Sequence, residues 1–315
     1  MDHARLNRHR ARNRSQSRRL AVAMALLLAL IGWLLGGWPL LLAGLAAVVL
    51  GYHFSQAIST LLLLRMHNAQ PLTAHQAPQL YRTLGILSQR AGLTTPQLYI
   101  FPHPAPNAFA TGTTEQPIIA ISDGLLLRLQ WEAVVGVLGH ELSHIRNGDL
   151  LLMGFADLTT RITALFSMAG LLILLVSLPM IVLTDLQMPW LLVILLISAP
   201  QVSILLQMAL SRTREFEADR GSAELIGSPL PLIKALRRID LQEITTFERL
   251  IFRRHQPTES SPVRSHPPTE QRIMRLQQLA PSRRWSPLQV IGNLRATPEL
   301  LHVSPTPPRA RRSWF

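Results

Sequence analysis

The sequence contains a run of 45 consecutive residues, 20–64, without Asp, Glu, Lys or Arg, and this run constrains the fold more than any other feature. Two further uncharged runs, residues 162–184 and 186–211, have 23 and 26 residues. Each run exceeds the roughly 20 apolar residues with which a helix crosses the hydrocarbon core of a bilayer. A wholly soluble protein is therefore excluded, and we expect an α-helical integral membrane protein.

The first uncharged run is too long for a single crossing. Residues 36–39, Gly-Gly-Trp-Pro, place two helix breakers and a helix-starting proline near its middle. This pattern predicts a transmembrane hairpin over residues 20–64, and the two later runs predict a second hairpin over residues 162–210. A cleaved signal peptide is the competing interpretation of the first run, but its apolar region would be only about 7 to 15 residues long.

Basic residues flank the outer ends of both predicted hairpins, at Arg19, Arg65, Arg161 and Arg212. By the positive-inside rule, both termini and the segment between the hairpins lie in the cytoplasm. The sequence therefore predicts four transmembrane helices in two hairpins, in a bacterial-type cytoplasmic (inner) membrane. The lipid bilayer is then an expected partner.

The net charge of +13 is concentrated in the two tails. Residues 1–19 carry seven Arg and one Asp, and residues 281–315 carry six Arg and one Glu. Aromatic residues make up only 6% of the chain, so stacking platforms for bases are scarce, and no nucleic-acid partner is expected. The absence of cysteine excludes disulfides, thiol catalysis and Cys-ligated metals, so that any metal must use His, Asp or Glu.

Two sequence-distant segments remain for folding in water, and together they are long enough for one compact α+β domain. The first segment, residues 65–161, is predicted to contain helices over Pro71–Ala91 and Trp131–Asn147 and strands over Gln97–Phe101, Asn107–Gly112 and Ile118–Ile121. The second segment, residues 211–280, is predicted to contain helices over Arg212–Ile226 and Leu230–Phe252. The division is completed by a basic cytoplasmic tail, 1–19, and a Pro/Arg-rich tail, 281–315, with little expected fixed structure.

The string His140-Glu141-Leu142-Ser143-His144 has the HExxH pattern on a predicted helix. Histidines at i and i+4 lie on one helix face, so their ring nitrogens can converge on a single zinc ion, and the glutamate can reach a water beside the metal. Two surface histidines on an amphipathic helix are the alternative. That alternative leaves unexplained the nearby Gly136 and Gly139, which cost helix propensity and favour close approach of another backbone or a substrate.

A catalytic zinc ion needs a third protein ligand and an open position. Glu215 and Asp219 follow the second hairpin at i and i+4, so one of them can ligate while the other accepts a hydrogen bond from a ligand imidazole. Glu217 lies elsewhere on the same helix and is expected to face solvent.

Three segments together resemble the signatures of the HtpX-type membrane metallopeptidases, which are relatives of the CAAX prenyl endopeptidases: HELSHIRNGD (140–149), SRTREFEADRGSA (211–223) and SHPPTEQRI (265–273). NAFATG (107–112) and ISDGLL (121–126) also fit, in the same order. The resemblance covers about residues 20–279. It implies a zincin-like (gluzincin) catalytic domain that carries one zinc ion per subunit.

The resemblance also implies a role for individual residues. Zinc would be held by His140, His144 and Glu215, while Asp219 would support a ligand histidine. Glu141 would be the catalytic acid/base. His266 would lie near the reaction centre, and an edge strand formed by Asn107, Ala108, Phe109 and Ala110 would bind the substrate backbone.

These residues predict a zinc-dependent endopeptidase. Zinc would polarise the scissile carbonyl, Glu141 would take a proton from water and pass it to the leaving amine, and His266 would donate a hydrogen bond to the oxyanion. Family resemblance implies quality control of misfolded membrane proteins during stress, in cooperation with other membrane quality-control proteases. A prenyl-protein processing peptidase and a non-catalytic zinc-binding membrane scaffold are the alternatives.

Overall fold

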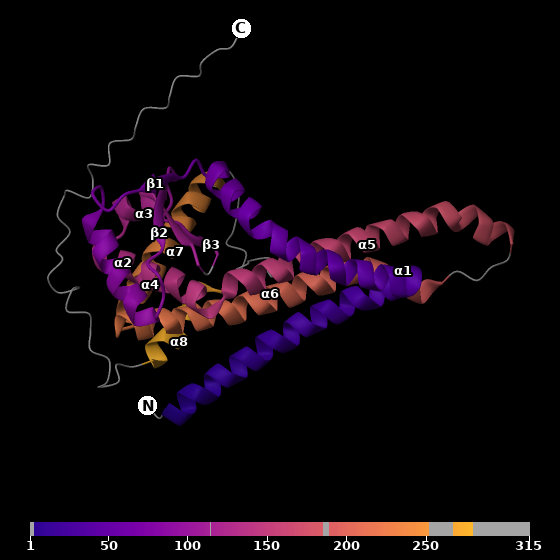
Figure 1. Cartoon of the computed structure of the whole chain (residues 1–315), viewed down its shortest axis with the longest axis horizontal. Helices are drawn as coiled ribbons and strands as arrows, with labels where there is room; N and C mark the ends of the chain where they lie inside the picture. Colours follow the sequence, from indigo (N-terminus) through magenta and orange to yellow (C-terminus); the bar gives the residue numbers. More distant parts are fainter. Residues whose placement is uncertain (1–2, 114, 185–188, 252–266, 280–315) are drawn as a thin grey trace, which may run out of the picture.

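The computed structural model describes residues 3–113, 115–184, 189–251 and 267–279. A small sheet and several helices form a domain at one end, and long helices extend away from it (Figure 1). Among the described residues, three helices are long and apolar enough to cross a membrane: α1 (His3–Met66), α5 (Asp149–Leu183) and α6 (Trp190–Ile226).

Helix α1 reverses its direction at the predicted breaker. Gly36 and Gly37 leave the helical conformation, and Gly37 has φ +63°, a value that favours glycine. Leu28 before the break and Val48 after it pack in one cluster with Ile162 of α5. The two halves of α1 therefore run back along each other beside α5 (Figure 1).

The three long helices pack on one another and leave apolar side chains on their outer surface. Val176 is 73% exposed and Leu191 is 83% exposed, as expected for side chains that face lipid. Polar contacts are found inside the bundle, where the hydroxyl oxygens of Thr160 and Ser203 lie 3.0 Å apart and link α5 to α6. The membrane helices thus expose apolar residues and satisfy some polar ones internally.

The sheet has four strands in the order β1-β2-β4-β3. Strand β2 (Gln97–Phe101) is parallel to β4 (Pro117–Ser122), whereas β1 (Gln70–Leu72) and β3 (Ala108–Gly112) are antiparallel additions at the two edges. The three predicted strands are confirmed within one residue at each end. Strand β3 is an edge strand, as the sequence predicts.

The helix predicted over residues 71–91 is wrong in its first part. Residues 70–72 form β1, which pairs with β2, and helix α2 runs only over Pro78–Ala91. The Tyr81 hydroxyl donates to the Leu72 carbonyl at 2.7 Å and so holds β1 against α2. Pro78 stands in the first turn of α2, where the missing amide hydrogen costs nothing. The short strand depends on its pairing with β2, which local sequence patterns do not reveal.

Helix α4 (Trp131–Asn147) matches its predicted bounds and is buried along most of its length. It packs against α6, against α7 (Leu230–Ile251) and against β3. Two short helices were not predicted, α3 (Asp123–Arg128) and α8 (Thr269–Gln278). One continuous hydrophobic core includes residues from both water-soluble segments, from Leu72 in the first to Leu276 in the second. The two segments therefore share one hydrophobic core.

Close packing around α4 explains its two glycines. A Cβ atom on Gly136 would lie 2.6 Å from the backbone of Leu232 in α7, and a Cβ on Gly139 would lie 2.9 Å from the Ser222 hydroxyl in α6. The Ser222 hydroxyl also donates to the Gly136 carbonyl at 2.9 Å. The predicted close approach of another backbone is confirmed at Gly136.

Candidate metal centre

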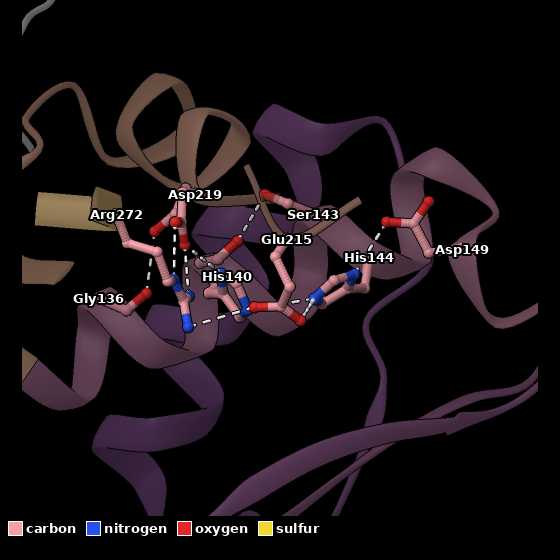
Figure 2. Close-up of polar contacts among 10 residues, drawn as sticks. Gly136, His140, Ser143, His144, Asp149, Glu215, Asp219 and Arg272 are labelled. Carbon is pink, nitrogen blue, oxygen red and sulfur yellow. Dashed lines mark hydrogen bonds and ion pairs between the residues drawn. The ribbon is translucent and has the colours of Figure 1, made fainter. Parts of the chain in front are cut away.

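Helices α4 and α6 bring three metal-binding side chains together. The Nε2 atoms of His140 and His144 lie 3.1 Å apart, and each lies 3.6 Å from an oxygen of Glu215 (Figure 2). The three side chains each offer one ligand atom, and these atoms lie within 4.8 Å of one another. The two imidazoles come from successive turns of α4, whereas the carboxylate comes from α6, beyond the second apolar hairpin.

An aspartate and an arginine support the ring of His144. Its Nδ1 lies 2.8 Å from Asp149 Oδ2, and Arg214 of α6 donates to the other oxygen of Asp149. Asp149 is only 2% exposed. Gly148, with φ +69°, ends α4 and turns the chain, so that Asp149 at the start of α5 lies beside a histidine five residues earlier. Hydrogen bonding at Nδ1 leaves Nε2 directed toward His140 and Glu215.

The ring of His140 has a matching arrangement. Its Nδ1 lies 3.0 Å from Asp219 Oδ1, and Arg272 of α8 donates to both oxygens of Asp219, at 2.8 and 2.5 Å. The same guanidinium lies 3.2 Å from Glu215 Oε2 (Figure 2). Asp219 is therefore placed beside a candidate ligand histidine, where the family resemblance implies a supporting role for it.

Burial and charge together shift the protonation of these groups. Burial alone would lower the pKa of His144, but hydrogen bonds to Asp149 and Glu215 outweigh it and raise that pKa to about 10 in the metal-free protein. Burial likewise opposes the charge on Arg272, yet the carboxylates of Asp219, Glu215 and Glu141 raise its pKa further. The site stabilises positive charge on His144, which is the environment that a cation needs.

The formal charges of the site leave room for one divalent cation. Four carboxylates, those of Glu141, Asp149, Glu215 and Asp219, face two guanidinium groups, those of Arg214 and Arg272. With neutral imidazoles the group carries a net charge of about −2, which one divalent ion neutralises. Two imidazole nitrogens and one carboxylate oxygen form a ligand set that suits zinc and leaves a coordination position open.

A cavity of about 480 Å³ opens beside the candidate ligands and includes Glu141, Glu215 and Arg272 in its wall. The Glu141 carboxylate makes no hydrogen bond or ion pair with any of the described residues. Asn107 and Ala108, at the start of the edge strand, line the same cavity. The cavity thus joins the ligand cluster, a candidate acid/base and a sheet edge.

The remaining site predictions have mixed outcomes. Phe109 and Ala110 continue the edge strand beyond the cavity wall, and His266 lies outside the described residues. The prediction that Glu217 faces solvent is wrong, because this side chain is only 9% exposed. Residues 213–226 of α6 are mostly buried, because this helix packs against other helices of the chain.

Sequence reasoning missed both arginines of the site, Arg214 and Arg272. Each lies inside one of the recognised motifs, so the motifs themselves contained the available signal. Asp149, the last residue of the HELSHIRNGD motif, also contacts a candidate ligand histidine directly.

The fold and the site define a membrane-embedded metallopeptidase, and comparison with known proteins specifies its family. Residues 74–280 match the model of peptidase family M48, and the chain belongs to this family. A protease HtpX homologue from Paenarthrobacter aurescens is 34% identical over 258 residues, which cover 77% of this chain and 85% of the relative. Another protease HtpX homologue, from Paraburkholderia phytofirmans, is 34% identical over 282 residues, which cover 84% of this chain and 96% of the relative.

The fold also resembles a solved structure, that of Ste24p from S. mikatae. The TM-score is 0.50 at 18% sequence identity, and the match covers 85% of this chain and 66% of Ste24p. This likeness supports the shared fold. The family and the HtpX relatives support the activity, and the chain is a membrane metalloendopeptidase.

Proposed function

We propose that this protein is a zinc-dependent endopeptidase that cleaves misfolded membrane proteins on the cytoplasmic side of a bacterial-type inner membrane. The observation that carries the proposal is the convergence of His140, His144 and Glu215 beside a cavity whose wall includes His140, Glu141 and Glu215. One zinc ion per subunit, held by the first three residues, would polarise the scissile carbonyl and lower the pKa of water toward about 7.

Glu141 would act as the acid/base of the reaction. Its carboxylate lies on the cavity wall one residue after the first histidine and takes no part in the Asp and Arg pairs behind the rings. It is therefore available to take a proton from the attacking water and to pass it to the leaving amine. The family resemblance implies that His266 lies near the reaction centre, where it would donate a hydrogen bond to the oxyanion.

The edge strand β3 would bind the substrate main chain. The Asn107 carbonyl accepts from the backbone amide of Ser122 in β4, and the Asn107 amide donates to the Ser122 hydroxyl. The outward-facing positions of the antiparallel edge are therefore Ala108, Ala110 and Gly112. Gly112 already donates its amide to Thr60 of α1 at 3.2 Å. The N–H and C=O groups of Ala108 and Ala110 are thus the ones that an extended peptide would pair with.

Recognition of the substrate main chain suits an enzyme with diverse protein substrates, because backbone pairing imposes little preference for particular side chains. The cavity wall also has an apolar part, formed by Val137 of α4 together with Leu232, Leu236 and Ile239 of α7. Such a wall suits the apolar side chains that misfolded membrane proteins expose. Stress-related quality control, in cooperation with other membrane proteases, is consistent with this chemistry.

We further propose four membrane crossings with both termini and the catalytic domain in the cytoplasm. The reversal of α1 at Gly36–Gly37 supports two crossings by α1, and α5 and α6 would supply the other two. The basic residues at the outer ends of both hairpins support the orientation.

The test is zinc analysis and casein digestion by purified wild-type protein and a Glu141→Gln variant. The variant should retain about one zinc ion per chain, because Glu141 is not a proposed ligand, and should lose cleavage by at least about 100-fold. His144→Ala and Glu215→Ala should lose both zinc and cleavage. Chelation should abolish wild-type cleavage, and added zinc should restore it.

Two results would contradict the proposal. Cleavage by Glu141→Gln at the wild-type rate would remove the acid/base assignment. Stoichiometric zinc binding without any cleavage would favour the non-catalytic scaffold. Cleavage of prenylated peptides alone would favour the prenyl-protein processing peptidase.

A further inference from the structure

The two histidines of the candidate metal centre are supported from different parts of the chain. Asp149 and Arg214, which support His144, lie at the start of α5 and on α6, next to the ligands themselves. Arg272, which supports Asp219 beside His140, lies on α8, beyond α7 and beyond residues 252–266. The metal centre is thus complete only when α8 packs against α6.

Arg272 contacts more of the centre than any other supporting residue described. Its guanidinium binds both oxygens of Asp219 and also lies 3.2 Å from Glu215 Oε2. Asp219 in turn lies beside His140, so one side chain is linked to two of the three candidate ligands. Arg272 is only 8% exposed, which concentrates these interactions in a medium with little screening by water.

The electrostatics of the cluster explain why such a side chain is needed. Glu215 and Asp219 lie one turn apart on the same face of α6, and Glu141 lines the same cavity as Glu215, so their negative charges repel one another. A planar guanidinium with five donors can bind two carboxylates at once in fixed directions. The ammonium group of lysine is a point charge and cannot reproduce this fork.

We propose that Arg272 is a positioning residue that fixes Glu215 and His140 in their metal-binding orientation, so that docking of α8 completes the metal centre. This inference rests on the proposed function, in which these two residues hold zinc. Arg272 does not itself ligate the metal; it acts through Glu215 and Asp219.

A second arginine of α8 provides a matched control. The Arg275 guanidinium lies 3.6 Å from the centre of the Phe216 ring, so Arg275 also joins α8 to α6, but through a residue that is no candidate ligand. If α8 needed only to be attached, loss of either arginine would have the same effect on metal binding. If Arg272 positions the ligands, only its loss should weaken metal binding.

The experiment is zinc titration of metal-stripped, full-length protein in detergent, for wild type, Arg272→Ala, Arg272→Lys and Arg275→Ala. Zinc affinity should fall by about 10–100-fold in Arg272→Ala, the usual effect of removing an outer partner of metal ligands. Zinc affinity should also fall in Arg272→Lys, because lysine keeps the positive charge but cannot bind two carboxylates in the fixed directions of a guanidinium group. Arg275→Ala should bind zinc as the wild type does, even where its melting temperature falls.

A spectroscopic measurement separates ligand geometry from general stability. The visible absorption of the cobalt-loaded protein should change in both Arg272 variants and stay unchanged in Arg275→Ala. The positioning role would be overturned if Arg272→Lys had the zinc affinity and cobalt spectrum of the wild type, or if Arg275→Ala lost as much zinc affinity as Arg272→Ala. The lysine variant tests the proposal even if the alanine variant does not fold. Failure of the wild type to bind zinc would instead contradict the proposed function.

Discussion

Each candidate ligand histidine is part of a chain of three side chains, His–Asp–Arg. His144 and Asp149 are five residues apart and belong to different helices, yet their side chains meet because Gly148 turns the backbone between them. The Asp fixes the ring orientation, and the buried Arg214 balances the charge of the Asp. The HExxH pattern therefore describes only part of what orients the ligands.

Asp149→Asn should weaken zinc binding by about 10–100-fold, because the amide cannot accept from His144 and Arg214 with the strength of a carboxylate. A competition titration with a chromogenic zinc chelator measures this effect. Asp157→Asn is the control, since the half-exposed Asp157 carboxylate pairs with Arg161 at the surface, where ion pairs contribute little. Equal affinities for Asp149→Asn and wild type would contradict the assigned role.

Helix α4 depends on its neighbours to place the site. Its glycines allow α6 and the start of α7 to approach closely, and this approach sets the distance between the imidazoles on α4 and the carboxylate on α6. The hydrogen bond from Ser222 to the Gly136 carbonyl joins the same two helices. Packing along α4 and metal geometry are therefore coupled.

Gly136→Ala should destabilise the protein by about 1–3 kcal/mol, because the added methyl group would meet the backbone of Leu232. Gly85→Ala in α2 is the matched control: nothing lies within 4 Å of its added Cβ, and alanine should stabilise that helix by about 0.5–1 kcal/mol. Thermal unfolding in detergent measures both changes. A Gly136→Ala variant at least as stable as the wild type would show that α7 can move away without cost.

The whole molecule places a pair of membrane helices between the two parts of its metal site. The imidazoles precede α5 and the carboxylate lies at the end of α6, so the ligands meet only when these two helices pack side by side. One hydrophobic core then joins the segments on both sides of the pair. Insertion into the membrane and assembly of the site are thus linked by the path of the chain.

The absence of cysteine allows a clean test of the proposed membrane topology. Single cysteines at Trp38, in the turn of α1, and at Thr184, after α5, should react with a membrane-impermeant maleimide in intact cells. Gln89→Cys, on the exposed face of α2, should react only after permeabilisation. Casein digestion by each variant would verify its fold. If only Gln89→Cys were labelled in intact cells, the catalytic domain would lie outside the cytoplasm, contrary to the proposed orientation.

Several elements follow directly from sequence patterns. The periodicity of α4 and the β-branched and aromatic runs of β2 and β4 reflect strong local preferences, and their bounds agree with the structure within one residue. Strand β1 and helix α8 were missed because each is short and is stabilised mainly by contacts with distant residues. Glu217 was placed wrongly for the same reason, since helical periodicity does not show how many neighbours surround a helix.

Composition and spacing were sufficient for the long apolar helices, the HExxH helix and the pair of acidic candidates one turn apart on α6, because uncharged length and helical spacing are properties of the local chain. Which of Glu215 and Asp219 faces the ring nitrogens that would bind the metal depends on the tertiary structure. In the structure Glu215 faces both Nε2 atoms, whereas Asp219 faces Nδ1 of His140 and binds Arg272. These distances depend on how α4, α6 and α8 pack, and packing between segments more than 50 residues apart arises only in the folded chain.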